Sequence, residues 1–171
     1  DMRTISMMDS SYPSHNAAGA DFAAPDSATV VDDDTKDNRL LTDFSHLASN
    51  NFRPERGLYH FSSFRFSRYD DYISTWTTEL PELKKAEVDM LLAEAELQLG
   101  NVQAAADIVN AGTRTTRGGL ANVAATADAV RDAITHERFV ELAVTSYGLQ
   151  YFDQRKRNDL QEGTFTQLPI P

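Results

Sequence analysis

The chain has 171 residues and a mass of 19.0 kDa, a length that suits one domain or part of a larger one. Sixteen Lys and Arg residues stand against 26 Asp and Glu residues, and the resulting net charge of −10 argues against nucleic acid as a partner. Because cysteine is absent, disulfides, thiolate zinc sites and cysteine nucleophiles are excluded. The sequence contains no run of about 18 apolar residues, so it predicts no membrane-spanning helix.

Residues 1–56 are predicted to form an irregular, loop-rich segment. Ser, Ala, Asp and Asn dominate, and apolar residues stand in isolated pairs such as Val30-Val31. Residues 32–37 have the acidity of a calcium loop, but Lys36 occupies a ligand position and no glycine or distal Glu follows. We interpret these residues as a solvated acidic loop. A segment of this length without periodicity is expected to wrap over a core.

Residues 57–80 are predicted to contain short strands and a linker. Tyr59 and Phe61 alternate on one face, and Phe64 and Phe66 alternate after a shift of phase at Ser62-Ser63. This pattern indicates one bulged strand or two short strands, with Phe61, Phe64 and Phe66 in the core.

Three aromatic residues follow in a polar stretch that also carries acidic side chains: Tyr69, Tyr72 and Trp76. Tyr and Trp combine an apolar body with a polar handle, and they are enriched at binding surfaces. Aromatic faces stack on sugar rings, and neighbouring carboxylates accept hydrogen bonds from sugar hydroxyls. These three are the candidate ligand-binding residues.

Residues 81–171 are predicted to be a helical region that belongs to one larger domain. After Pro81, apolar residues recur at spacings of three and four from Leu83 to Leu97, and further apolar residues up to Leu99 predict a helix buried on more than one side. Gly100 ends this helix, and Asn101 caps a second one over residues 102–111. The short turn makes the two helices an antiparallel pair.

The rest of this region is predicted to hold a loop over 115–120 with Gly118-Gly119 as its breaker, and a third helix that begins at Thr126 and reaches about Ser146. A short helix over 149–157 and a terminal strand over 165–168 complete the prediction.

Two carboxylates and an arginine share the third helix. Glu137, Arg138 and Glu141 are neighbours at helical spacing, so they form either a catalytic carboxylate pair or an ion-pair network that ties this helix to Asp153 and Arg155. We favour the network, because an arginine within reach holds both carboxylates ionised. The four histidines, His15, His46, His60 and His136, show no metal-ligand spacing. No catalytic residue, metal site or cofactor is expected.

Several segments in order resemble the SusD/RagB family over about residues 37–171, the C-terminal part of a family member. They are Asp37-Asn38-Arg39-Leu40, residues 81–101, Glu137-Arg138-x-x-Glu141-Leu142, residues 151–155 and Leu168-Pro169-Ile170-Pro171. Residues 86–111 also resemble one tetratricopeptide-type helix pair, without a second copy along the chain. The chain departs from the family at Lys84, where Arg is usual, and at Tyr147-Gly148-Leu149-Gln150, where a charged pair is usual.

The resemblance implies a mainly α fold of tetratricopeptide-like helical hairpins, with long loops and a few short strands in an α-α superhelix. It also implies a nutrient-binding subunit, not an enzyme, that captures oligosaccharide or another nutrient and works with a SusC-like TonB-dependent transporter. Such lipoproteins lie on the outer surface of the outer membrane, and the expected contact with the membrane is only through an anchor outside this chain. The alternative is a tetratricopeptide-type protein-interaction or cell-surface structural module.

Overall fold

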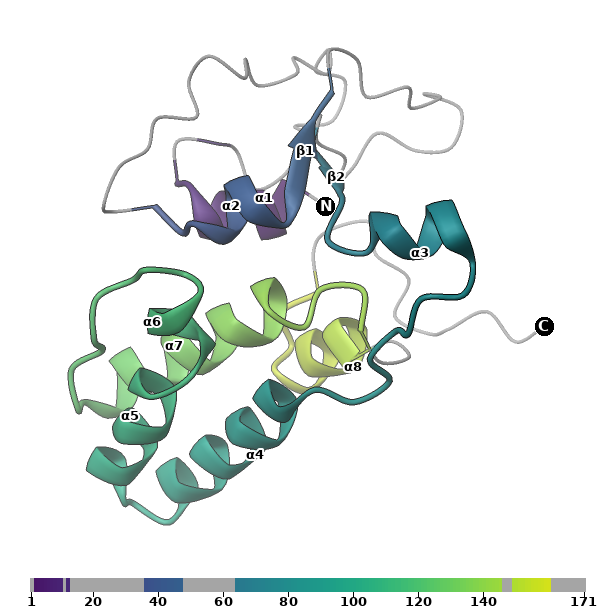
Figure 1. Ribbon diagram of the computed structural model, residues 1–171. Helices are drawn as coiled ribbons and strands as arrows, with labels where there is room; N and C mark the ends of the chain where they lie inside the picture. The colour runs from purple at the N-terminus through teal and green to yellow at the C-terminus, as the bar shows by residue number, and fades with distance from the viewer. Residues whose placement is uncertain (1, 11, 13–35, 48–63, 146–148, 161–171) are drawn as a thin grey trace.

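The computed structural model describes residues 2–10, 12, 36–47, 64–145 and 149–160. Within them the elements are α1 (Met2–Met8), α2 (Arg39–Thr42), β1 (Phe44–His46), β2 (Phe64–Phe66), α3 (Asp70–Thr75), α4 (Lys85–Gln98), α5 (Val102–Asn110), α6 (Thr113–Thr116), α7 (Ala127–Val140) and α8 (Leu149–Lys156). The protein is mainly helical, and β1 and β2 pair as a two-stranded sheet (Figure 1). The predicted fold class is confirmed.

The first core lies among α4, α5 and α7. Its buried residues are Met90, Ala93, Ala105, Ala106, Val109, Val130, Ala133 and Ile134. Ala93 and Ala105 are both fully buried. Their small side chains allow the antiparallel α4–α5 pair to approach closely. Gly100 takes a φ of +83° and ends α4, as predicted, since the left-handed conformation is cheap only for glycine.

The second core lies in a layer built from α1, α2 and the sheet, above the helical body in Figure 1. Its buried residues are Ile5, Met8, Tyr12, Leu40, Phe44, Phe64 and Val140. The strands are antiparallel, with Phe44 opposite Phe66 and His46 opposite Phe64. Val140 closes α7, so this one helix contributes to both cores and joins the layer to the helical body.

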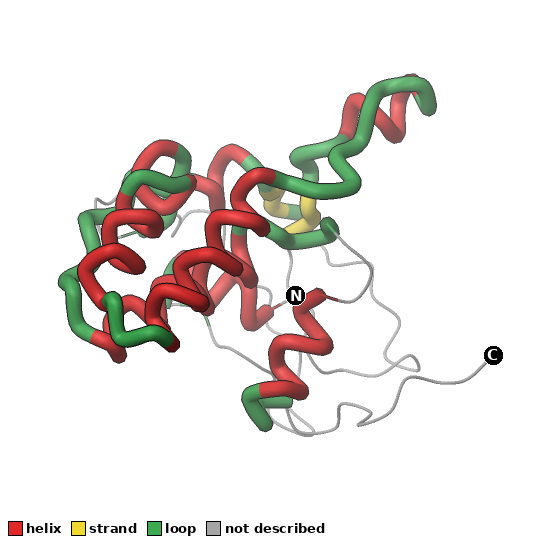
Figure 2. The backbone as a smooth tube through the Cα atoms, turned by 90° about the horizontal axis from the view of Figure 1, so that it is seen from below, coloured by secondary structure: helices red, strands yellow, loops and turns green. Residues whose placement is uncertain are grey.

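Helix α3 stands apart from both cores. None of its residues is buried, and it projects from the body together with the segment that leads to α4 (Figures 1 and 2). Trp76, the C-cap of α3, has a φ of +58°, which is uncommon for a non-glycine residue. The segment therefore forms an arm over residues 67–83 whose side chains remain accessible.

Several local predictions are confirmed. Thr126 caps α7, since its Oγ1 accepts a hydrogen bond from the Ala129 amide at 3.4 Å. Helices α4, α5 and α8 lie where they were predicted. Phe64 is buried, whereas Phe66, predicted to be core, is only partly buried.

Other predictions are wrong in detail. The outer side of α4 is not buried, because Leu91 and Leu99 are 54% and 75% exposed. Asn101 precedes α5 but makes no side-chain cap; its Nδ2 donates to Glu96 Oε2 instead. Helix α7 ends at Val140 and turns follow it, while α6 occupies part of the predicted loop.

The N-terminal segment, predicted to be irregular, carries α1, α2 and β1. The predicted strand at 57–61 with its core residue Phe61, the terminal strand at 165–168 and residues 32–35 of the acidic loop lie outside the described residues. The prediction of a solvated loop is wrong for Asp37, which is only 1% exposed.

Candidate ligand-binding groove and the buried ionic cluster behind it

A groove of about 750 Å³ opens between the arm and the turn that follows α7. Its lining residues come from three places along the chain: Phe66, Tyr69, Asp70, Tyr72 and Ile73; Leu80, Pro81 and Glu82; Val144 and Thr145. The walls are mainly apolar, and two carboxylates lie among them. An accessible, mainly apolar concavity with a few polar groups has the usual character of a small-molecule site.

The structure brings the three candidate ligand-binding residues to this groove. Tyr69 and Tyr72 line it, and Trp76 stands beside it with its ring 5.8 Å from the Tyr72 ring at an interplanar angle of 62°. Trp76 is 71% exposed, so its ring face is open to a ligand. Solvent exposure therefore increases along the three side chains, from the half-buried Tyr69 to the exposed Trp76.

Tyr69 connects the groove to charged residues behind it. Lys84 Nζ lies 5.6 Å from the Tyr69 ring centroid and Arg68 Cζ lies 5.7 Å from it, both within cation–π range. Burial, with nearby carboxylates, raises the pKa of the Tyr69 hydroxyl. The Tyr69 hydroxyl is buried without a hydrogen-bond partner among the described residues.

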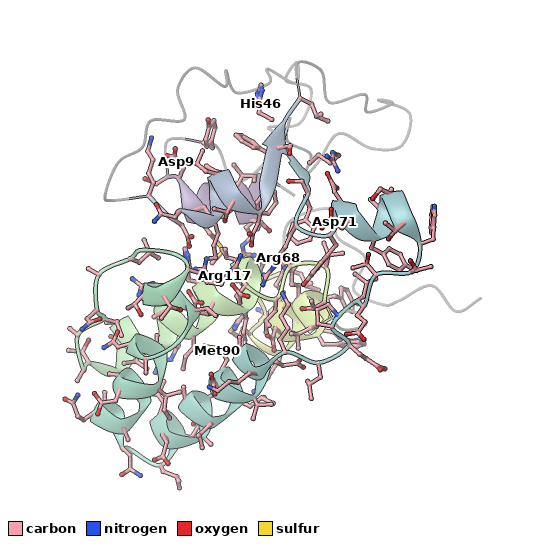
Figure 3. The ribbon with its side chains drawn as sticks, viewed as in Figure 1. Asp9, His46, Arg68, Asp71, Met90 and Arg117 are labelled. Atoms are coloured by element: carbon pink, nitrogen blue, oxygen red, sulfur yellow. The ribbon has the colours of Figure 1, made fainter. Side chains whose placement is uncertain are left out.

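The charged residues behind Tyr69 form the buried ionic cluster, which sits where the N-terminal layer meets α7. Four carboxylates and four cations make it up: Asp37, Asp43, Glu137, Glu141, Arg39, Arg68, Lys84 and Arg117. They come from segments far apart in the sequence, and Arg68 and Arg117, both labelled in Figure 3, pair with the same carboxylate, Glu141. The equal numbers of opposite charges allow each to be paired.

Arg39 is the best-satisfied member of this cluster. Its side chain is fully buried, and hydrogen bonds satisfy the N–H groups on two edges of the planar guanidinium. Nε and Nη2 donate to Asp37 at 2.8 and 2.6 Å, Nη2 and Nη1 donate to Glu137 at 2.7 and 2.8 Å, and Nη1 donates to Glu141 at 3.3 Å. Burial opposes the charge of Arg39, but these hydrogen bonds raise its pKa above the usual range.

Two of the carboxylates, Asp37 and Glu141, are held ionised in the same way. Burial alone raises the pKa of Asp37, but hydrogen bonds from His136 and Arg39 outweigh it and hold that pKa well below its usual range. The pKa of Glu141 is also lowered, since Arg68, Arg117 and Lys84 outweigh its burial. Burial, with repulsion from Arg68, lowers the pKa of Lys84 to about 8.

Gly118 lets this cluster close. A Cβ at this position would lie 3.1 Å from Arg39 Nη2, 3.2 Å from Asp37 Oδ1 and 2.6 Å from the Arg114 carbonyl oxygen. The predicted Gly118-Gly119 breaker is therefore also a point of close packing, where the chain after α6 comes against the charged residues.

The predicted ion-pair network on α7 is confirmed for Asp153 but not for Arg155, which forms no ion pair within the part of the chain that the structure describes. Arg138 pairs with Asp153 at 3.1 Å, as expected, and also with Glu94 at 2.8 Å. Glu137 and Glu141 point to the other side of the helix and pair with arginines from other segments. The pKa of Glu141 is lowered, which is the opposite of the raised pKa that a general acid needs.

The sequence did not identify the rest of the groove. Asp70, one of the acidic side chains in the polar stretch, is held by Arg65 through contacts of 2.6 and 2.7 Å. Val144 is 76% exposed and has a φ of +60°, an outlier for a β-branched residue, which no local sequence signal announces. These residues meet in the groove because segments distant in the sequence lie close in space, and no local sequence pattern reports that proximity.

Within the described residues, no group of three or more His, Asp or Glu side chains is arranged to hold a metal ion. None of the helices in that part of the chain combines the length and the hydrophobicity needed to span a bilayer.

Comparison with known proteins gives one match. The model of the SusD family matches residues 5–165, which is most of the chain. No curated protein and no solved structure matches the chain significantly. The family match spans α1 to α8, and it includes the groove and the buried ionic cluster. The chain belongs to the SusD family.

Proposed function

We propose that this protein is a nutrient-binding subunit of the outer membrane that captures a saccharide and works with a TonB-dependent transporter. Proteins of the SusD family are binding proteins that associate with such transporters, and they are outer-membrane lipoproteins. The observation in this chain that carries the proposal is the aromatic groove: Tyr69 and Tyr72 line it, and Trp76 extends it into solvent.

The groove supports capture without bond breaking. The Tyr72 and Trp76 rings stand edge to face, so a sugar ring can lie against one aromatic face while the other ring borders its edge. The Asp70 and Glu82 carboxylates are acceptors for sugar hydroxyls. Binding of this kind uses stacking and hydrogen bonds only, and release to a transporter then needs no chemical step.

The proposal is tested by titrating the protein with oligosaccharides and following its tryptophan fluorescence. Trp76 is the only tryptophan, so a change in emission reports directly on the groove. We expect a saturable change with at least one neutral glycan, and about a tenfold weaker affinity after Tyr72→Ala, because a stacking aromatic contributes on the order of 1 kcal/mol or more.

A matched control for this experiment is Phe152→Ala. Phe152 is an aromatic residue on α8 that is 49% exposed and does not line the groove. It should leave the affinity unchanged. If no glycan alters the emission, or if both variants weaken binding equally, saccharide capture at the groove is wrong.

The transporter partnership has its own test. Affinity purification of the native protein from its own membranes, followed by mass spectrometry, should recover a TonB-dependent transporter in near-equal amount. Recovery of other proteins in its place would contradict this part of the proposal and leave saccharide capture to be judged by the titration.

The alternative, a protein-interaction module, is favoured by one specific observation on α4. Val88, Leu91, Leu92 and Leu99 are 49–75% exposed and lie on the side of the helix opposite Met90 and Ala93. Such an apolar stripe is typical of a surface that receives another helix. Charged substitutions there, such as Leu91→Glu with Leu92→Glu, should abolish binding of a protein partner while saccharide affinity is retained.

A further inference from the structure

The charges around the groove are distributed unevenly. Among the residues that the structure describes, its lining contains two carboxylates, Asp70 and Glu82, and no Lys or Arg. Asp71 and Glu79 are exposed on the same arm. The whole chain is acidic as well, with a net charge of −10. A ligand that approaches the groove therefore meets a negative potential.

The three cations that flank the groove in the described part of the chain, Arg65, Arg68 and Lys84, are already engaged. Both terminal nitrogens of Arg65 bind Asp70, Arg68 binds Glu141 at 2.8 Å, and Lys84 donates to the Glu141 carbonyl oxygen at 2.7 Å. Lys84 is also buried, as are the carboxylates that hold Arg68. An anionic ligand would have to break one of these pairs to gain a countercharge, which costs more than a surface ion pair returns.

Glu82 differs from Asp70 in being unpaired. It is exposed, it lines the groove, and it forms no ion pair within the described residues. Its charge is therefore the one that a bound ligand meets directly.

We propose that Glu82 sets the charge selectivity of the groove, so that it accepts amino-bearing and neutral saccharides and rejects those that carry carboxylate or sulfate groups. This inference rests on the proposed saccharide capture and narrows its ligand class. The ammonium group of a hexosamine pairs with Glu82 while the sugar ring stacks on the Tyr72 and Trp76 side chains. A uronate ring of the same shape stacks equally well but places its charge against the carboxylates.

The test uses glucosamine, glucose and glucuronate, which share one ring. Each charged sugar differs from glucose in a single group, an ammonium at C2 in glucosamine and a carboxylate at C6 in glucuronate. Each is titrated into the whole chain near neutral pH and low salt, and Trp76 emission is followed. Glucosamine should bind about two- to fivefold more tightly than glucose, the range expected for an exposed ion pair, and glucuronate should bind more weakly by a similar factor. Added salt should narrow these differences.

Two variants assign the effect to one residue. Glu82→Gln should bring glucosamine to the affinity of glucose, and Glu82→Lys should reverse the order so that glucuronate binds best. Glu79→Lys makes the same charge change on the same arm outside the groove lining, and it should keep the native order. Because Glu82 and Glu79 are both exposed, neither change should disturb folding.

The outcomes separate this inference from the proposed function. If glucuronate binds the native protein as well as glucosamine does, or if Glu79→Lys reverses the order as Glu82→Lys does, the charge selectivity is wrong while saccharide capture stands. If none of the three sugars changes Trp76 emission up to its solubility limit, saccharide capture at the groove fails, and the selectivity fails with it.

Discussion

Helix α7 passes through two buried regions of opposite chemistry. Its first half packs Val130, Ala133 and Ile134 against α4 and α5, where every buried side chain is apolar. Its second half presents Glu137 and Glu141 to arginines from three other segments. The first region is stabilised by the exclusion of water, and this stabilisation does not depend on the direction of any individual contact. The second is stable only while each charge keeps its partners.

The two regions connect different parts of the molecule. The apolar core makes the helical hairpin and its third helix a unit. The buried ionic cluster then joins that unit to the N-terminal layer and to the base of the arm, since its members come from α2, the β2–α3 turn, the start of α4, the end of α6 and α7. Changes in the two regions should therefore have different signatures.

The largest effect should come from Arg39→Met. The change leaves the buried carboxylates of Asp37 and Glu137 without their main partner, and we expect a loss of about 3–5 kcal/mol in the free energy of unfolding. Arg39→Lys, which keeps the charge but not the planar fork, should recover only part of this loss. Urea denaturation measures both. A loss below about 1 kcal/mol for Arg39→Met would mean that the cluster contributes little to holding the layer in place.

The next effect tests the apolar region with two adjacent residues of one helix. Met90 is 1% exposed and Leu91 is 54% exposed. Met90→Ala should cost about 2–5 kcal/mol through the lost burial and the cavity left behind. Leu91→Ala should change the free energy of unfolding by less than about 0.5 kcal/mol. Equal losses would show that the outer side of α4 is covered in solution.

Acid should weaken the cluster and spare the apolar core. The folded-state pKa values of Asp37 and Glu141 lie below their ordinary values of 3.8 and 4.5, so the unfolded chain binds more protons as the pH falls. The stabilisation is complete above those ordinary values and is lost as the pH falls toward the folded-state values. Denaturation curves across this range should show a steep decline that Leu91→Ala retains. A flat profile would contradict the paired state of these carboxylates.

The smallest effect should appear on the alkaline side. The pKa of Lys84 is lowered from 10.5 to about 8 in the folded protein, so between these values the unfolded chain holds a proton that the folded chain has released. Stability should therefore rise with pH in this window, by at most about 3 kcal/mol. Lys84→Met should remove the rise, whereas Lys85→Met, at an exposed neighbour, should keep it. A rise that persists in Lys84→Met would assign it to another group.

Much of the helical body could be predicted because its signals are local. The apolar spacing of α4, the glycine after it and the threonine before α7 each act within a few residues, and the structure bears them out. The same reasoning failed on the outer side of α4. Apolar residues occur on both sides of that helix, but only one side meets α5 and α7.

The groove could be predicted only in part. The spacing of Tyr69, Tyr72 and Trp76 in a polar stretch marked the arm, but it did not indicate that Val144 and Thr145 would form the opposite wall. Neither did the sequence indicate Glu82 as the unpaired charge, because that status depends on which cations are taken by other carboxylates. Likewise, the charged residues of α7 indicated an ion-pair network, but their pattern did not predict Arg39, Arg68 or Arg117 as its partners.

The sequence by itself determined α4, α5, α8 and the start of α7, the glycine that ends α4, the threonine that caps α7, the antiparallel hairpin and the family to which the chain belongs. All of these depend on residues close together along the chain or on motifs in a fixed order. Only the tertiary structure decided which carboxylate meets which arginine, which side of α4 faces solvent, and where the arm closes a groove. Those features bring together residues up to about a hundred positions apart, such as Arg39 and Glu141. Pairings of this kind depend on the packing of whole elements, and short-range patterns carry no information about them.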